Sequence, residues 1–205
     1  MKVLVLANNE VSKPLIGWLD EREDVTIRQT KMTRDEMRSL GPELVVSYCY
    51  RHILKPDVIA EMPGKLINLH ISYLPYNRGA DPNAWSFLDD TPKGVTVHLI
   101  DAGVDTGPTL LQKRVAFDEA HDTLLGTYFK LHQELRELFI ENWGAIRVGA
   151  IQPKPQMATG TYHRSAEFAA IRERLLGVEG WDITIKLFRD RYRQLSGSDM
   201  YGHGQ

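Results

Sequence analysis

The sequence predicts an α/β protein with a mostly parallel, twisted sheet, helices on both faces and a short C-terminal appendage. Three observations support this fold class. Apolar, β-prone segments alternate with helical segments through residue 107, as in parallel strands joined by crossover helices. The first segment, 2–7 (KVLVLA), is almost continuously apolar, as in a central strand covered on both faces. The segment 109–116 follows its predecessor after too short a gap for a crossover, so we expect an antiparallel strand there.

The individual elements follow from periodicity and from turn residues. Short β-prone segments predict strands at 2–7, 25–29, 43–48, 66–70, 94–100 and 109–116. Helical spacing and capping residues predict helices from Ser12 through Leu19 and at 35–40, 57–61, 79–90, 124–148 and 166–176. Pro153 and Pro155 then interrupt regular structure. We therefore expect a main domain at 1–152 and an appendage at 153–205, whose end, 196–205, is frayed.

Composition excludes several classes of protein. The chain has 205 residues, of which 42% are hydrophobic and 25% charged, with a net charge of −2. This balance, without a long basic run, argues against binding to nucleic acid through its phosphates. No apolar stretch is long enough to span a membrane, and the single cysteine, Cys49, fits a reducing compartment. The prediction is a cytoplasmic protein that binds neither nucleic acid nor a membrane, with Cys49 packed rather than nucleophilic.

Three polar side chains suggest a catalytic site. The strand 66–70 (LINLH) alternates, so Asn68 and His70 share one face. The glycines of 101–107 (DAGVDTG) allow that loop to fold back and to bring Asp105 toward the strand ends. Alone, each residue has a commoner structural role, as a cap, a packed histidine or an Asx turn. Together, an amide, an imidazole and a carboxylate supply what acyl-transfer chemistry needs.

Five motifs in order resemble the folate-dependent formyltransferases. They are N-x-H at 68–70, S-x-L-P at 72–75, R-G at 78–79, G-V-T-x-H at 94–98 and D-x-G-x-D-T-G at 101–107. The layout of the whole chain is most similar to that of the small sugar N-formyltransferases, which are relatives of the methionyl-tRNA and glycinamide ribonucleotide formyltransferases. The resemblance implies a Rossmann-like fold and a formyltransferase catalytic domain at 1–152.

The resemblance also implies the reaction and most of its residues. Asn68, His70 and Asp105 match the catalytic triad, and N10-formyltetrahydrofolate is the implied co-substrate, with no metal. We expect burial to raise the pKa of Asp105, and His98 either to support the site or to pack on its strand. By position, the folate pocket is lined by Arg51, His52, Ile53 and Leu54, although core packing explains Ile53 and Leu54 equally well.

The acceptor is predicted less directly. A glycine-rich phosphate turn is missing after the first strand, where the chain reads ANNEV, and this disfavours glycinamide ribonucleotide. An amino sugar linked to a nucleotide fits the chain layout best. Such a substrate needs an aromatic or polar shelf for its base and cations for its phosphates. The substrate-binding candidates are Asn9, Arg78 and Lys93, with Lys13 and Arg51 as further cations.

Other readings stay open at this point. Glycinamide ribonucleotide or another small amine is an alternative acceptor, and hydrolysis of formyltetrahydrofolate or non-catalytic folate binding are alternative functions. The tail after Pro155 is too short for a core of its own but rich in apolar residues, so it must pack on the main domain or on a second copy. We expect a homodimer, and an interface or packing role for Tyr162 and His163, with substrate contact as the alternative.

Overall fold

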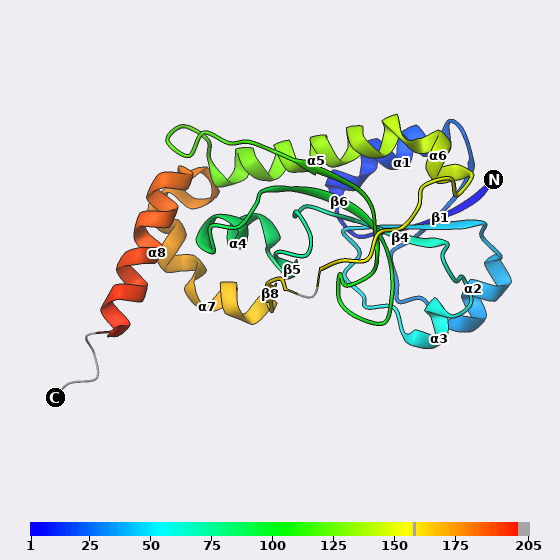
Figure 1. The fold of residues 1–205 in the computed structure, drawn as a ribbon, viewed down its shortest axis with the longest axis horizontal. Helices are drawn as coiled ribbons and strands as arrows, with labels where there is room; N and C mark the ends of the chain where they lie inside the picture. Colours follow the sequence, from blue (N-terminus) through cyan, green and yellow to red (C-terminus); the bar gives the residue numbers. More distant parts are fainter. Residues whose placement is uncertain (158, 201–205) are drawn as a thin grey trace.

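The computed structural model describes residues 1–157 and 159–200 and centres on one six-stranded sheet (Figure 1). The strand order is β2-β1-β3-β4-β6-β7. The strands are β1 (Lys2–Ala7), β2 (Asp24–Arg28), β3 (Leu44–Tyr48), β4 (Leu66–His70), β6 (Gly94–Leu99) and β7 (Thr109–Arg114). All six predicted strands are present, with boundaries within two residues of the predicted ones.

The sheet is parallel on one side and antiparallel on the other. β2, β1, β3 and β4 pair in parallel, whereas β6 pairs antiparallel with both β4 and β7. The mostly parallel α/β fold and the antiparallel β7 are therefore confirmed. The antiparallel direction of β6 follows from the segment that precedes it, since the short helix α4 (Pro82–Leu88) returns the chain without a full crossover.

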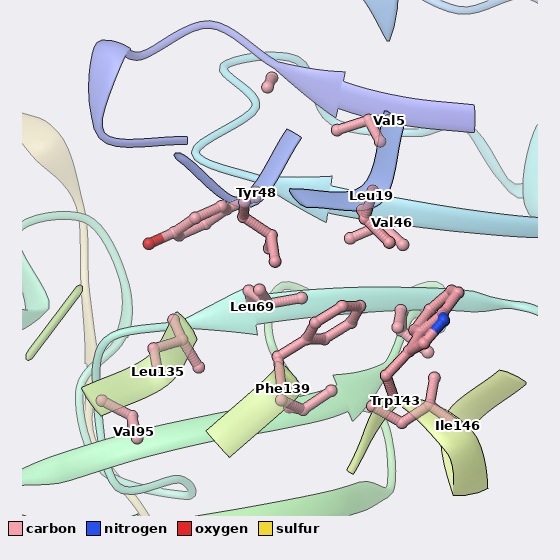
Figure 2. Packing of buried hydrophobic residues seen from close by; sticks show 14 of the residues in the cluster. Val5, Leu19, Val46, Tyr48, Leu69, Val95, Leu135, Phe139, Trp143 and Ile146 are labelled. Carbon is pink, nitrogen blue, oxygen red and sulfur yellow. The ribbon is translucent and has the colours of Figure 1, made fainter. Parts of the chain in front are cut away.

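Alternation along the strands separates two cores. Val3, Val5, Val46, Leu69 and Val97 face α1 (Lys13–Asp20), α5 (Leu124–Glu141) and α6 (Trp143–Arg147). Figure 2 shows Leu135, Phe139 and Trp143 packed against this face. The alternate residues Leu4, Leu6, Val45 and Leu66 face α2 (Arg34–Leu40) and α3 (Pro56–Ile59). Both faces are covered, as predicted, so only the ends of the strands remain open for ligands.

The helix predicted at 79–90 is shorter than expected. Arg78–Gly79 forms a two-residue strand, β5, which pairs in parallel with β8 (Tyr162–His163). Gly79 has φ +88° and Asp81 has φ +52°, and neither value is compatible with a right-handed helix. α4 therefore begins at Pro82, whose fixed φ suits the first turn.

Two other helices differ from prediction. The helix expected at 124–148 is broken at Asn142, whose ψ of 7° separates α5 from α6. Ser12 precedes α1, after the 3-10 turn η1 (Glu10–Ser12), but it makes no side-chain cap, because its hydroxyl donates to the Asn9 carbonyl at 2.5 Å.

The C-terminal segment packs on the main domain. It forms α7 (Ser165–Leu176), the 3-10 segment η2 (Gly177–Asp182) and α8 (Ile185–Met200). Phe168, Leu175 and Phe188 are buried with Trp85 and Phe87 of α4, and Figure 1 shows the C-terminal helices beside α4, near the N-terminal end of α5.

The structure of the C-terminal segment contradicts part of one prediction and leaves two others untested. The frayed end predicted at 196–205 is wrong for 196–200, which continue α8, while 201–205 lie outside the described residues. Because most of the tail's apolar residues are covered within one chain, the need for a second copy is smaller than expected, and the homodimer stays a prediction. The domain boundary at 152/153 also stays one. No helix among the described residues is long and apolar enough to cross a membrane.

Candidate active site

The carboxyl end of β4 and the facing strand β6 bring three polar side chains together. Asn68 and His70 lie on the same face of β4, and Asn68 is directly opposite His98 on β6. This face is the one opposite α5, because Ile67, Leu69 and Val97 point toward that helix. The period of two along each strand therefore brings Asn68, His70 and His98 together without any contribution from a loop.

The loop after β6 delivers the carboxylate of Asp105. Asp101 Oδ1 accepts hydrogen bonds from the Gly103 amide at 3.1 Å and from Thr106 Oγ1 at 2.6 Å, which folds the loop back on itself. A Cβ at Gly107 would lie 1.9 Å from the Leu99 carbonyl oxygen, so only glycine allows the return. Asp105 itself has φ +53°, a left-handed conformation that Asp tolerates better than most residues.

Asp105 is the centre of the resulting network. Its Oδ1 lies 3.2 Å from Asn68 Nδ2 and 3.5 Å from His98 Nε2. Its Oδ2 accepts a 2.9 Å hydrogen bond from the Gly79 amide and lies 3.7 Å from His70 Nδ1. The sequence prediction that Asn68, His70 and Asp105 come together is in accord with this geometry.

Backbone carbonyls determine which nitrogen of each histidine carries a proton. His70 Nε2 lies 3.0 Å from the Asn77 carbonyl, which can only accept, so Nε2 is the donor and Nδ1 faces Asp105. His98 Nδ1 lies 2.8 Å from the Leu99 carbonyl in the same way. His98 Nε2 lies 3.2 Å from Asn68 Nδ2 and 3.5 Å from Asp105 Oδ1, so this nitrogen contacts both side chains.

The expected rise in the pKa of Asp105 is wrong. Burial alone would raise the pKa of this carboxyl, but the positive charge that His70 can carry, the contact with His98 and the Gly79 amide outweigh it. The net effect holds the pKa of Asp105 well below its usual range. The lowered pKa favours the carboxylate form of Asp105, which suits a role in orienting and stabilising its neighbours.

These residues lie in the wall of a cavity of about 920 Å³. One half is lined by the segment after β3 and by the loop after β6. The other half is lined by α4, by the start of α5 and by the C-terminal segment. Asn68, His70, His98 and Asp105 all line the same cavity. A volume of this size accommodates two ligands of moderate size or one large one.

All four predicted folate-pocket residues line the first half of this cavity: Arg51, His52, Ile53 and Leu54. The side chain of Ile53 is 73% exposed, so core packing does not explain it, whereas Leu54 is buried against α2 and α3. Cys49 lies beside them with φ +54°. Burial raises the pKa of its thiol to about 12, which agrees with a packing role.

The predicted substrate-binding residues lie elsewhere. Asn9 caps the turn after β1 and is 3.4 Å from Tyr128 Oη. Arg78 donates to Gln156 Oε1 at 2.7 Å, and Lys93 lies 3.4 Å from Asp90 Oδ1 and over the Phe87 ring. None of the three lines the cavity.

Sequence reasoning missed two parts of the wall. His132 is buried, contacts Tyr48 Oη through Nδ1 at 2.7 Å and lines the cavity. Its position four residues after Tyr128 on one helix face was the available signal. Tyr162 and His163, expected to pack, both line the cavity as well. Among the described residues, no three histidine, cysteine or acidic side chains are grouped as metal ligands.

A family model described as "Formyl transferase" matches residues 17–142. The crystal structure of the formyltransferase PseJ from Anoxybacillus kamchatkensis, in complex with UDP-4,6-dideoxy-4-formamido-L-AltNAc and tetrahydrofolate, superimposes with a TM-score of 0.85. It is 39% identical, over 94% of this chain and 100% of that one.

Curated relatives are similar over part of their length. A methionyl-tRNA formyltransferase of Thermodesulfovibrio yellowstonii is 38% identical over 62% of this chain and 41% of its own length. A dTDP-4-amino-4,6-dideoxyglucose formyltransferase of Mycobacterium bovis is 33% identical over 66% of this chain and 56% of its own. The chain thus spans about half the length of the curated relatives it matches.

Proposed function

The chain belongs to the formyl transferase family, and from that premise we propose that it transfers a formyl group from N10-formyltetrahydrofolate to the amine of a nucleotide-linked amino sugar. The observation that carries the proposal is the position of Asn68, His70 and Asp105. The three line one cavity, whose wall also includes Arg51 to Leu54, α4 and the C-terminal segment. A two-substrate reaction needs this arrangement, with the reacting groups between two ligands.

The first half suits the formyl donor. Ile53 offers an exposed apolar side chain to a flat ring, and Arg51 offers a cation. Arg51 has no side-chain hydrogen bond or ion pair within the described residues. A guanidinium without a partner matches a carboxylate such as those of the glutamate tail of folate. The acceptor is then left with the second half.

The reaction itself follows from the donors and acceptors around Asp105. The neutral amine forms a bond to the formyl carbon, and the carbonyl electron pair moves onto the oxygen. An N–H of Asn68 stabilises that oxyanion, since its present hydrogen bonds at 3.2 Å are long and easily exchanged.

Proton transfer falls to His70. His70 Nδ1 takes the proton of the attacking nitrogen, because Nε2 is held by the Asn77 carbonyl. The anionic Asp105 stabilises the imidazolium that results. When the bond from the formyl carbon to N10 breaks, the same proton passes to N10, which leaves tetrahydrofolate and the formylated amine.

The sugar-nucleotide acceptor is supported by similarity over the whole length of PseJ. The net charge of −2 gives no electrostatic attraction to tRNA. Glycinamide ribonucleotide is disfavoured by Asn8, Asn9 and Glu10 at the position of a phosphate turn.

A turnover screen tests the proposal. N10-formyltetrahydrofolate is incubated with UDP-4-amino-4,6-dideoxy-L-AltNAc, with dTDP-4-amino-4,6-dideoxyglucose, with glycinamide ribonucleotide, with methionyl-tRNA or without acceptor. We expect tetrahydrofolate to form with a sugar nucleotide, with kcat/KM at least tenfold above that for the other two amines. Preference for glycinamide ribonucleotide would contradict the sugar assignment, while formate release without acceptor would indicate a hydrolase. Binding of folate without turnover of any acceptor would indicate a non-catalytic module.

A cytoplasmic location and a homodimer accompany the proposal as predictions. Cell fractionation tests the first. Analytical ultracentrifugation at micromolar concentration tests the second, and a single monomeric species would contradict it.

A further inference from the structure

His132 is a buried histidine of the cavity wall that the proposed chemistry does not use. It is only 3% exposed and lies one turn after Tyr128 on α5, with 4.4 Å between the centroids of the two rings. Its Nδ1 lies 2.7 Å from Tyr48 Oη. Its Nε2 is buried and has no hydrogen-bond partner among the described residues. A buried polar nitrogen without a partner is costly, so Nε2 must meet a water or a ligand in the cavity that His132 lines.

The contact with Tyr48 determines which nitrogen of His132 carries the proton. Tyr48 is 1% exposed and does not line the cavity, and within the described part of the chain its hydroxyl makes no other hydrogen bond. If Nδ1 were the donor, the phenolic proton would be buried without an acceptor. The hydroxyl therefore donates to Nδ1, and the neutral ring carries its proton on Nε2.

The charge of His132 indicates which chemical group Nε2 can bind. Burial lowers the pKa of His132 to about 4, with Arg136 and His70 adding to the effect, so the ring is neutral near pH 7. A neutral N–H donor matches an uncharged hydroxyl or carbonyl oxygen, whereas a phosphate or carboxylate is better matched by a cation. The partner of Nε2 is therefore an uncharged oxygen.

His132 reaches the cavity from the face of the sheet that α5 covers. Tyr48 packs in the same core as Val46, and Figure 2 shows its hydroxyl pointing away from that residue. Leu54 and Ile100 also line the cavity, but they pack in the core of the other face, with α2 and α3. The folate proposed to bind beside Leu54 thus approaches the strand ends from one face of the sheet. The acceptor is the ligand left for the face of His132.

We propose that His132 is a specificity-determining residue, whose Nε2–H donates a hydrogen bond to a hydroxyl or carbonyl oxygen on the sugar of the acceptor. The inference rests on the proposed function and deepens it, because this donor selects among amino sugars by the oxygen they carry. An acceptor that lacks the oxygen leaves the buried donor unpaired and is disfavoured. Tyr48 acts through His132 as a positioning residue, since it holds the proton on Nε2.

Steady-state kinetics, with each substrate varied separately, test the role of His132. His132→Leu removes the donor, and we expect KM for the sugar nucleotide to rise about five- to hundredfold, as for the loss of one buried hydrogen bond. KM for N10-formyltetrahydrofolate should change less than threefold, and kcat should fall less than that KM rises. His132→Gln keeps an amide donor and should recover part of the affinity. A rise confined to KM for the formyl donor would overturn the proposal.

Tyr48→Phe tests the positioning role of the phenol. It leaves the imidazole in place but frees its proton to move to Nδ1, so the same KM should rise by less than in His132→Leu. His121→Gln is the matched control, because it removes an exposed histidine outside the cavity lining. Both KM values should be unchanged in His121→Gln.

Deoxy analogues of the sugar test the same hydrogen bond from the side of the ligand. Analogues of the sugar nucleotides in the turnover screen, lacking the C3 hydroxyl or the C2 substituent, are compared on the unmodified protein and on His132→Leu. One analogue should be poorer on the unmodified protein by about the factor lost in His132→Leu, and should lose little more in that variant, because donor and acceptor are then both absent. Unchanged kcat/KM for both analogues on the unmodified protein would overturn the proposal, whether or not the variants fold.

The two proposals fail in different ways. No turnover of any sugar nucleotide by the unmodified protein would overturn the proposed function, and the role of His132 with it. Turnover by the unmodified protein, with unchanged KM for the sugar nucleotide in His132→Leu and His132→Gln, would overturn the role of His132 alone and would indicate that Nε2 binds a water. Circular dichroism of each variant checks that it is folded.

Discussion

Asn68 and His98 face each other across two antiparallel strands, with 3.2 Å between Asn68 Nδ2 and His98 Nε2. His98 Nδ1 lies 2.8 Å from the Leu99 carbonyl, which fixes the orientation of the ring and keeps Nε2 against the amide of Asn68. This contact determines which way the Asn68 side chain points, and therefore whether its nitrogen or its oxygen meets the oxyanion. His98 is thus a positioning residue that acts through Asn68.

Replacement of His98 should affect turnover more than binding. In His98→Phe the amide of Asn68 loses its anchor, and we expect kcat to fall about tenfold, the loss of roughly one hydrogen bond. KM for the amine should change less than threefold. His98→Gln retains an acceptor and should recover part of the rate in steady-state assays. A change in KM alone would contradict the positioning role.

Removal of the Asn68 amide should have the larger effect. Asn68→Ala loses the oxyanion donor itself, and we expect kcat to fall by about 10²- to 10³-fold. Asn142→Ala is a suitable control, because within the described part of the chain that amide bonds only the Leu138 carbonyl at the end of α5. Full activity of Asn68→Ala in the formyl-transfer assay would refute the catalytic assignment.

Gly79 links the tail to Asp105 and should not tolerate a side chain. A Cβ there would lie 2.3 Å from the His163 carbonyl oxygen, and the φ of +88° is unfavourable for alanine. We expect Gly79→Ala to lower the free energy of unfolding by about 2 kcal/mol and to reduce kcat, because the amide that holds Asp105 moves. Gly144→Ala in α6, where nothing lies within 4 Å, should be neutral or stabilising in the same urea titrations.

His132 should make the fold sensitive to acid. Burial lowers its pKa to about 4, with Arg136 and His70 adding to the effect. The unfolded chain has the usual histidine pKa of about 6.5, so it binds a proton between these values that the folded chain does not. Stability is therefore complete above pH 6.5 and falls as the pH drops toward 4. At pH 4.5 the loss attributable to His132 is about 2 to 3 kcal/mol.

Comparison with a variant isolates that contribution. Urea unfolding of the unmodified protein and of His132→Gln should converge as the pH falls from 7 to 4.5, since the glutamine does not titrate. The hydrogen bond to Tyr48 makes the unmodified protein the more stable at pH 7. Parallel stability curves for the two proteins would show that His132 titrates normally.

Substitutions at two neighbouring residues of α8 test whether the tail unfolds together with the main domain. Phe188 is fully buried against α4 and α7, whereas Leu187 is 36% exposed. We expect Phe188→Ala to lower the free energy of unfolding by about 3 to 5 kcal/mol and Leu187→Ala by less than about 1 kcal/mol. One cooperative transition should persist in both. A separate early transition in Phe188→Ala would indicate a tail that folds independently.

Local patterns were sufficient for the strands and for bringing together two of the candidate catalytic residues. Alternation in 66–70 places Asn68 and His70 on one face because the backbone repeats every two residues, whatever surrounds it. The glycines at 103 and 107 identified a loop that must turn back, and so placed Asp105 near the strand ends. The helix predicted at 79–90 failed because no spacing rule reveals that Gly79 and Asp81 take positive φ.

By itself, then, the sequence determined the α/β sheet, the triad and the family it resembles, because these depend on spacing along the chain. The tertiary structure alone decided the pKa direction of Asp105, the anchoring of Asn68 by His98 and the burial of His132 in the cavity wall. Each of these depends on the electrostatic potential at a side chain or on its solvent exposure, and segments far apart in the chain create both. The potential and the exposure are set by packing in three dimensions, and no local sequence pattern encodes that packing.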